Sequence, residues 1–204
     1  MRLRRGGLSS DPAEVVGSDG GPPRTYVAGV GYTHLKDYSV GPLVLERLEV
    51  RASEEEWPEA VMLGDLSYDP VKIVHWLNAE DPPFERLILI SAAARGRAPG
   101  EVTAYRWDQN LPDPEQIQTR VAEAVTGVID IDNLLVVMCA FGAAPPEICI
   151  VEIEPVLEEM GEELSPEVAK GAREAEEIVR NIALGSSDPS PLPTGPLGGF
   201  GSGN

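Results

Sequence analysis

Cysteine and histidine are scarce in this sequence, with two of each among 204 residues. Cys139 and Cys149 are too few for a disulfide framework, and the Cys and His residues do not have the spacing of a zinc finger. Both cysteines lie in apolar surroundings. We therefore expect buried free thiols and not a Cys–His nucleophile.

Long apolar runs are also missing. No stretch of about 18 apolar residues occurs, so a transmembrane helix is not expected. The basic start from Met1 to Arg5 is not followed by the apolar core of a secretory signal peptide. These two features predict a cytoplasmic protein with no membrane span.

Basic residues are few. The sequence has 16 Lys and Arg and 34 Asp and Glu, which gives a net charge of −18. A protein that binds nucleic acid needs a basic face, so nucleic acid is not expected as a partner. The surplus of acid favours a solvated surface or a basic protein partner.

The composition divides the chain into three parts. Residues 1–24 contain Gly-Gly, Ser-Ser, Asp-Pro and Pro-Pro and are predicted to form a flexible arm. Residues 186–204 are mostly Gly, Pro and Ser with almost no charge and are predicted to be a disordered tail. Residues 25–185 between them are predicted to form one folded domain.

Apolar runs alternate with helical patterns inside this domain. The patterns predict strands at 25–30, 59–63, 86–92, 102–107 and 148–153, and helices at 40–48, 70–77, 114–125, 133–141 and from 166 to about 184. Asp69 and Ser165 are expected to cap helices, since each is followed by a proline that suits a first turn. The alternation predicts an α/β fold, a three-layer sandwich with a mostly parallel central sheet flanked by helices.

A glycine turn, Gly29-Val30-Gly31, ends the first predicted strand. A dinucleotide-binding fingerprint needs a third glycine three residues later, where this chain has His34. A nucleotide-binding α/β protein therefore stays as a minor alternative, resting on this turn alone.

A longer ordered pattern starts at the same glycines. It runs through residues 29–42 and continues in the segments 87–92, 98–102, 133–135, 142–145, 148–155 and 164–168. The set includes an apolar central strand, a Pro-Gly turn at 99–100, a Gly-x-x-Pro loop at 142–145 and a late strand ending in Pro155. This order of segments resembles the NiFe-hydrogenase maturation endopeptidases and covers nearly all of residues 25–185.

The resemblance implies the α/β fold of that family and a partner, the precursor of a hydrogenase large subunit. The enzymes of the family recognise nickel already inserted in the precursor and remove its C-terminal extension. Their nickel contacts are an acid in the first loop, an Asp at the end of the central strand and a His before a later helix. Carboxylate and imidazole are suitable ligands for divalent nickel.

The three ligand positions do not match in this sequence. They correspond to Tyr38, Ser91 and, if no gap intervenes, about Gly127. None of these residues is a normal nickel ligand, so the three are instead candidates for a cleft that faces a partner. Asp37 does match the acid that precedes the first ligand in the family.

Substitute ligands for nickel can be drawn from His34, Asp37, Asp65 and Asp130. Three of these residues also have a structural interpretation. Asp130 precedes an apolar helix, where Asp normally caps the N-terminus. Asp65 lies in a sequence typical of turns, and His34 in a solvated loop.

Two functions from different classes follow from the resemblance. The first is a catalytically degenerate assembly protein that binds a hydrogenase large subunit or a hydrogenase-type complex. The alternative is an active nickel-dependent endopeptidase that uses the substitute ligands to remove the C-terminal extension of the precursor.

Overall fold

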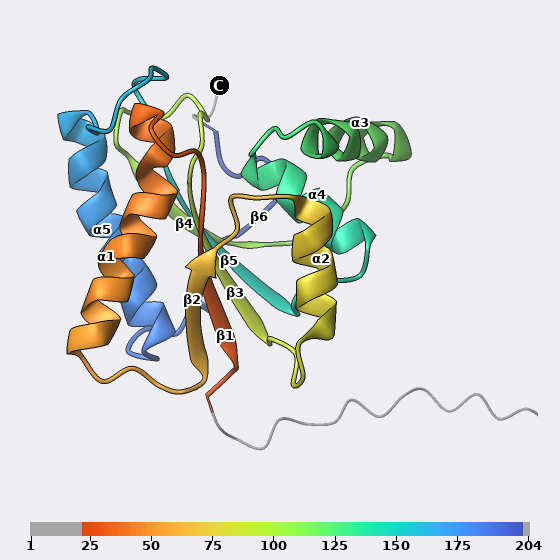
Figure 1. The fold of residues 1–204 in the computed structure, drawn as a ribbon, viewed down its shortest axis with the longest axis horizontal. Coiled ribbons are helices and arrows are strands. Elements are labelled where there is room, and N and C mark those ends of the chain that lie inside the picture. Colours follow the sequence, from red (N-terminus) through yellow and green to blue (C-terminus); the bar gives the residue numbers. More distant parts are fainter. Residues whose placement is uncertain (1–21, 202–204) are drawn as a thin grey trace, which may run out of the picture.

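A six-stranded sheet forms the middle layer of the protein. The computed structural model describes residues 22–201, whose arrangement is shown in Figure 1. The spatial order of the strands is β2-β1-β3-β5-β4-β6. Strands β2, β1, β3 and β5 are parallel, whereas β4 runs antiparallel to β5. The strands are Thr25–Val30 (β1), Val61–Asp65 (β2), Arg86–Ala92 (β3), Val102–Trp107 (β4), Glu147–Ile153 (β5) and Thr194–Gly195 (β6).

Helices cover both faces of the sheet, and together the layers confirm the predicted α/β sandwich. Helices α1 and α5 lie on one face, α2 and α4 lie on the other, and α3 packs on α4 (Figure 1). The helices are Val40–Glu54 (α1), Pro70–Ala79 (α2), Pro114–Val125 (α3), Ile131–Ala140 (α4) and Pro166–Ala183 (α5), with a short 3₁₀ helix at Lys36–Ser39 (η1). None of these helices, which lie within residues 22–201, is long and apolar enough to cross a membrane.

Strand β3 shows why the central strands are apolar on both sides. Leu87 and Leu89 face the helices α2 and α4, while Ile88 and Ile90 face α1 and α5. All four side chains are buried, because a parallel sheet covered on both faces leaves no solvated side. The alternation also fixes which side chain of each strand faces which helix layer.

The ends of the helices follow from the residues that cap them. The Asp69 side chain accepts a hydrogen bond from the Val71 amide, and the Ser165 hydroxyl accepts one from the Val168 amide, as predicted. The first helix extends further than its apolar stripe predicted, to Glu54. The second strand begins two residues later than predicted because the Val61 amide donates to the carbonyl of Pro58 in a turn.

The two cysteines differ in their burial. Cys149 on β5 is buried, and its burial raises the pKa of the thiol to about 12. Cys139 on α4 is only half-buried, in contrast to the expectation for both residues. Burial also raises the pKa of the Cys139 thiol, so neither group is an activated thiolate.

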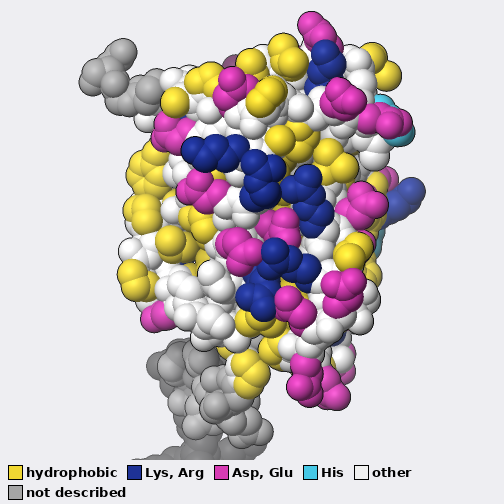
Figure 2. Space-filling view, turned by 90° about the vertical axis from the view of Figure 1, so that its left-hand side faces the viewer, with side chains coloured by type: hydrophobic (Ala, Val, Ile, Leu, Met, Phe, Trp, Pro, Cys, Tyr) yellow, Lys and Arg dark blue, Asp and Glu magenta, His cyan; other side chains and the backbone are white. Residues whose placement is uncertain are grey.

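The outer face of α1 and α5 carries arginines interleaved with acidic side chains (Figure 2). Arg51 contacts Glu176 and Glu177 at 2.7 and 2.8 Å, and Arg180 contacts Glu55 at 2.6 Å. These pairs join the two helices across their exposed side. Glu176 is buried, whereas the other members of these pairs are in contact with solvent. Solvated pairs contribute at most about 1 kcal/mol each, so the apolar layer beneath contributes most to holding the helices together.

Part of the segment predicted to be a disordered tail, residues 186–204, lies against the domain in the structure. Residues 192–201, called the C-terminal strap below, contain β6, which pairs with Arg106 and Trp107 of β4. Three apolar side chains in the strap, Leu192, Leu197 and Phe200, pack against the domain. The composition hid these contacts because three apolar residues are few among many Gly, Pro and Ser. The predicted N-terminal arm lies outside the described residues, except for residues 22–24.

Two valines of α1 provide a matched test of the packing. Val44 has 0% exposed surface and Val50 has 54%. Val44→Ala should lower the free energy of unfolding by about 2 kcal/mol, because two buried methyl groups are removed and a cavity is left. Val50→Ala should change it by less than about 0.5 kcal/mol. Urea unfolding followed by circular dichroism measures both, and equal losses would contradict this packing.

Candidate functional site

The loops that follow the parallel strands meet at one end of the sheet, where ligand sites of α/β proteins usually lie. The loop after β1 includes η1, the loop after β3 spans residues 93–101, and the loop after β5 spans residues 154–165. The amide of Ile129, between α3 and α4, donates to the Tyr32 hydroxyl at 3.1 Å. This bond brings the α3–α4 loop to the same end.

Two glycines that flank the first loop, Gly29 in β1 and Gly41 in α1, allow close packing of the backbone. A Cβ on Gly29 would lie 2.7 Å from the carbonyl oxygen of Gly41. A Cβ on Gly41 would lie 2.5 Å from the carbonyl oxygens of both Val30 and Ile90. The start of α1 therefore rests directly on the ends of β1 and β3. Backbone atoms fill the space that a phosphate would need at these glycines, so the turn lends no support to nucleotide binding.

Asp37 is a buried structural acid. Its carboxylate has 0% exposure and accepts hydrogen bonds from the amides of Val156 at 2.9 Å, Leu157 at 2.8 Å and Ser165 at 2.7 Å. The hydroxyl of Ser165 donates a fourth bond at 3.0 Å. A carboxylate has about four acceptor sites. Three of these bonds go to Oδ2 and one to Oδ1, and they tie the first loop to the loop after β5. A carboxylate engaged in this way and without exposed surface is not open to a metal ion.

The other substitute ligands are dispersed at the surface. His34 has a 64% exposed side chain, whose Nδ1 lies 3.3 Å from Glu162. Asp65 accepts from the Ser67 amide in a turn, and Asp130 accepts from the Asn133 amide as the cap of α4. Burial and the neighbouring Asp132 charge raise the pKa of Asp130. Within residues 22–201, no three His, Cys, Asp or Glu side chains form a group that could hold a metal ion.

The residues predicted to correspond to the family's ligand positions do not fit nickel either. Ser91 is buried at the end of β3, and its hydroxyl donates to the carbonyl of Ala92 at 3.0 Å. Burial raises the pKa of the Tyr38 phenol, and nearby carboxylates, among them Asp130, raise it further. Gly127 is exposed in the turn before α4 with a φ of +92°, and a Cβ there would meet nothing within 4 Å. A neutral hydroxyl, a protonated phenol and a glycine do not make a nickel site.

A network of buried charges lies beside Ser91. In the register of the sheet Ser91 pairs with Glu152 of β5, whose side chain has 0% exposure. Arg95 Nη2 donates to Glu152 at 2.7 Å, and both Nη atoms of Arg95 donate to Asp132 at 2.9 Å. Arg97 Nη2 donates to the other oxygen of Glu152 at 2.7 Å. The two carboxylates at this end of the sheet are thus held by two guanidinium groups from the loop after β3.

Two further groups complete this network. The Tyr105 hydroxyl donates to Glu152 at 3.0 Å, and Arg97 Nε donates to Glu154 at 3.3 Å. Burial lowers the pKa of the Arg95 guanidinium, but its hydrogen bonds to Asp132 and Glu152 outweigh burial, and the net shift is upward. Burial and the Glu152 charge both raise the pKa of the Tyr105 phenol. Arg95 therefore stays positively charged and Tyr105 stays protonated at any physiological pH.

Sequence reasoning missed this network, although signals for it exist. Glu152 interrupts an apolar strand, and a carboxylate at such a position needs a partner because a lone buried charge is very costly. Arg95 and Arg97 follow the central strand within five residues of its end. Pairing these signals would have required the sheet order, because β3 and β5 are separated by 54 residues between Ala92 and Glu147 that include β4.

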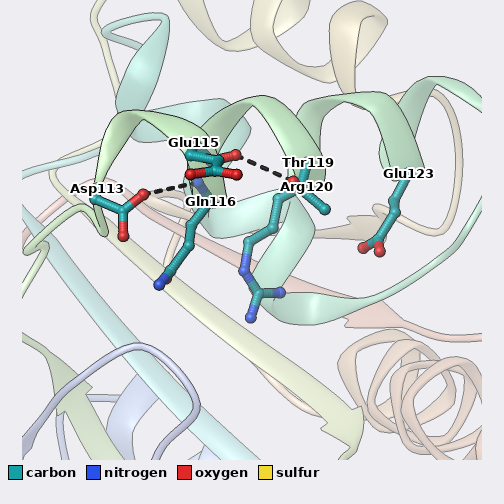
Figure 3. Close-up of a pocket in the computed structure, with 6 residues that line it drawn as sticks. All are labelled: Asp113, Glu115, Gln116, Thr119, Arg120 and Glu123. Carbon is teal, nitrogen blue, oxygen red and sulfur yellow. Dashed lines mark hydrogen bonds between the residues drawn. The ribbon is translucent and has the colours of Figure 1, made fainter.

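A polar hollow of about 480 Å³ is lined by side chains of helix α3 and its cap (Figure 3). Its residues are Asp113, Glu115, Gln116, Thr119, Arg120 and Glu123. Asp113 caps the helix by accepting from the Gln116 amide, and Arg120 Nη1 donates to Asn133 of α4 at 3.1 Å. Arg120 also lies 3.9 Å from Asp132, so it adds a third positive charge beside the buried network. The hollow therefore includes two residues, Arg120 and Glu123, that link α3 to Asn133 of α4.

The role of Asp37 can be tested by Asp37→Asn. An amide group would point donor hydrogens at backbone N–H groups, so unfolding free energy should fall by about 2–4 kcal/mol. His34→Ala, at an exposed position of the same loop, should change it by less than about 0.5 kcal/mol. Chemical unfolding measures the difference. An Asp37→Asn protein of native stability that has lost nickel binding would instead make Asp37 a metal ligand.

The buried network predicts a large cost for Arg95→Met. The change should lower the free energy of unfolding by about 3–5 kcal/mol, because Asp132 loses two guanidinium hydrogen bonds and Glu152 keeps only one of its two arginines. Arg173→Met, at an exposed position of α5, is the matched control and should change it by less than about 0.5 kcal/mol. Chemical unfolding measures both variants, and equal losses would contradict a role of Arg95 in holding the buried carboxylates.

Solved structures identify the fold. The hydrogenase maturating endopeptidase HybD from Escherichia coli has a TM-score of 0.58 and 24% identity, over 80% of this chain and 94% of its own. An endopeptidase from Escherichia coli solved in solution has a TM-score of 0.59 and 22% identity, over 83% and 95%. The hydrogenase 2 maturation peptidase from Thaumarchaeota archaeon SCGC_AB-539-E09 has a TM-score of 0.55 and 23% identity, over 80% and 99%. No family model and no curated protein matches the chain. The fold is that of the NiFe-hydrogenase maturation endopeptidases, as the ordered sequence segments implied.

Proposed function

We propose that this protein is an assembly factor that binds a NiFe-hydrogenase large subunit, or a hydrogenase-type complex, without cutting it. The fold of the maturation endopeptidases supports the partner. The observation that carries the loss of proteolysis is the chemistry at the carboxyl end of the sheet. Tyr38, Ser91 and about Gly127 are the residues predicted for the ligand positions, and guanidinium groups already hold the carboxylates that lie beside Ser91.

The alternative, an active nickel-dependent endopeptidase, needs ligands that converge. Asp37 would have to give up four hydrogen bonds in the core to bind a metal ion. His34, Asp65 and Asp130 are engaged at the surface by an acidic neighbour, a turn and a helix cap. Glu152 would have to leave two arginines. The exchanges at the buried carboxylates of Asp37 and Glu152 would each cost several kcal/mol before any metal is bound, which favours the assembly role.

An apolar groove beside Gly127 suits a protein partner. It lies between α3 and α4 and has a volume of about 550 Å³. Val125 and Phe141 line it, and they are 68% and 57% exposed. Contiguous exposed apolar side chains commonly mark protein interaction sites. We assign this groove to the large subunit because it adjoins the position that corresponds to the family's histidine ligand.

The test is to isolate the tagged full-length protein from its natural host and to measure the intact mass of the large subunit that comes with it. The expected result is a bound large subunit whose C-terminal extension has already been removed by another enzyme. It should remain bound in the presence of a metal chelator, because the contact does not require nickel in the protein. A bound precursor that is released only when it is cut would establish the alternative.

Paired variants connect this result to the groove. Val125→Asp combined with Phe141→Asp should reduce the recovered large subunit by at least about tenfold, because two charges are placed in an apolar contact. Val50→Asp, at an exposed position on the far helix α1, should leave the recovery unchanged. If the double variant recovers as much large subunit as the unchanged protein, the large subunit does not bind at this groove.

A further inference from the structure

The C-terminal strap, residues 192–201, binds the domain in the way that an extended peptide ligand binds a sheet. Its strand β6 pairs in parallel with the outer edge of β4. The amides of Arg106 and Asp108 donate to the carbonyls of Pro193 at 2.9 Å and Gly195 at 3.0 Å. Without the strap, β4 would be an edge strand with both of these donors unpaired. Main-chain pairing of this kind is independent of sequence.

Two glycines of the strap fit positions that admit no side chain. A Cβ on Gly199 would lie 2.9 Å from the Tyr105 hydroxyl and 3.0 Å from a Glu152 carboxylate oxygen, and its φ is +61°. A Cβ on Gly195 would lie 2.9 Å from the rings of both Tyr105 and Phe200. The strap therefore lies directly against the buried charge network, and the fit selects for glycine.

Apolar side chains hold the strap on both sides of these glycines. Leu192 packs with the core beneath α1 and α5, and Leu197 packs with the core beneath α2 and α4. The edge of the Phe200 ring meets the Tyr105 ring, with centroids 5.5 Å apart and planes at 79°. Residues 185–188, which lead into the strap, are exposed. The strap thus has separate anchor points and an exposed tether.

The surface under the strap is preorganised. Glu152 accepts hydrogen bonds from both Arg95 and Tyr105, and these bonds do not involve the strap. The strap adds backbone hydrogen bonds, apolar contacts and one side-chain bond, from Arg106 to the Thr194 hydroxyl at 3.3 Å. Backbone pairing for affinity and pockets for specificity are the features of peptide recognition by strand addition.

We propose that this surface is a peptide-binding groove that the strap occupies as an intramolecular ligand. When the strap is displaced, an extended segment of a partner takes its place. That segment has the chemistry of residues 197–200, two glycines between a leucine and an aromatic residue. The groove is formed by the edge of β4 and by Tyr105, Glu152 and Arg95. It differs from the apolar groove between α3 and α4, so the two proposals can fail separately.

The test uses the full chain with a protease site inserted between Ser187 and Asp188, both exposed, and cut after folding. A fluorescent peptide of residues 188–204 is then titrated and its anisotropy is measured. The cut protein should exchange its strap for the labelled peptide. The uncut protein should bind it at least about 100-fold more weakly, because the tethered strap is present at a high effective concentration. No binding to the cut protein, or equal binding to both, would overturn the proposal.

Three competitor peptides test the chemistry of the groove. The peptide with Gly199→Val should compete at least about 30-fold more weakly than the unchanged peptide, because its side chain would meet Tyr105 and Glu152. The peptide with Ser190→Val, at an exposed position, should compete as well as the unchanged one. A third peptide keeps only residues 195–200 and has alanine or serine elsewhere, and it should still displace the label. Failure of the third peptide, or full competition by the first, would refute the proposed partner chemistry.

Discussion

The carboxylate of Glu152 is shut off from solvent, so its charge has to be balanced inside the protein. Two guanidinium groups and one phenol surround it, and they come from the loop after β3 and from β4. The loop is in turn fixed because Glu154 accepts hydrogen bonds from the amides of Arg95 and Gly96. Asp132 lies on α4 and pairs with Arg95, so the position of α4 also depends on this network. The carboxyl end of the sheet is thus organised by one internal ion network, on which the strap also rests.

Such an ion network can replace a metal site at this end of the sheet without a change in the fold that this chain shares with the maturation endopeptidases. Most of the apolar burial lies in the two layers that cover the sheet, and Asp37, Arg95 and Arg97 at the loop ends are not part of them. The buried carboxylates of Glu152 on β5 and Asp132 on α4 need positive charge, and a metal ion or an arginine can supply it. In this chain Arg95 and Arg97 supply it. Asp37, predicted to match an acid of the family pattern, is the acceptor of four hydrogen bonds.

Much of the fold could be predicted because its signals are local. The apolar run of β3, the caps at Asp69 and Ser165 and the alternation of elements each depend on neighbours in sequence. The strap and the ion network could not be predicted in the same way. Arg106 and Thr194, which form a hydrogen bond, are 88 residues apart in the sequence, and Arg95 and Glu152 are 57 residues apart. Such contacts depend on the order of strands in the sheet, and the composition of residues 186–204 pointed away from order. The roles of Asp65 and Asp130 were predictable because turns and caps are local.

Strands β4 and β6 are far apart in sequence, and this separation has a consequence for biosynthesis. Strand β4 leaves the ribosome 88 residues before the segment that pairs with its outer edge. At bacterial and eukaryotic elongation rates this interval lasts roughly 4 to 18 seconds. During that time the nascent domain presents an unpaired strand edge, which is a template for association with other chains. The period of greatest aggregation risk therefore falls during translation, and chaperones that bind extended segments have a defined place on this chain to act.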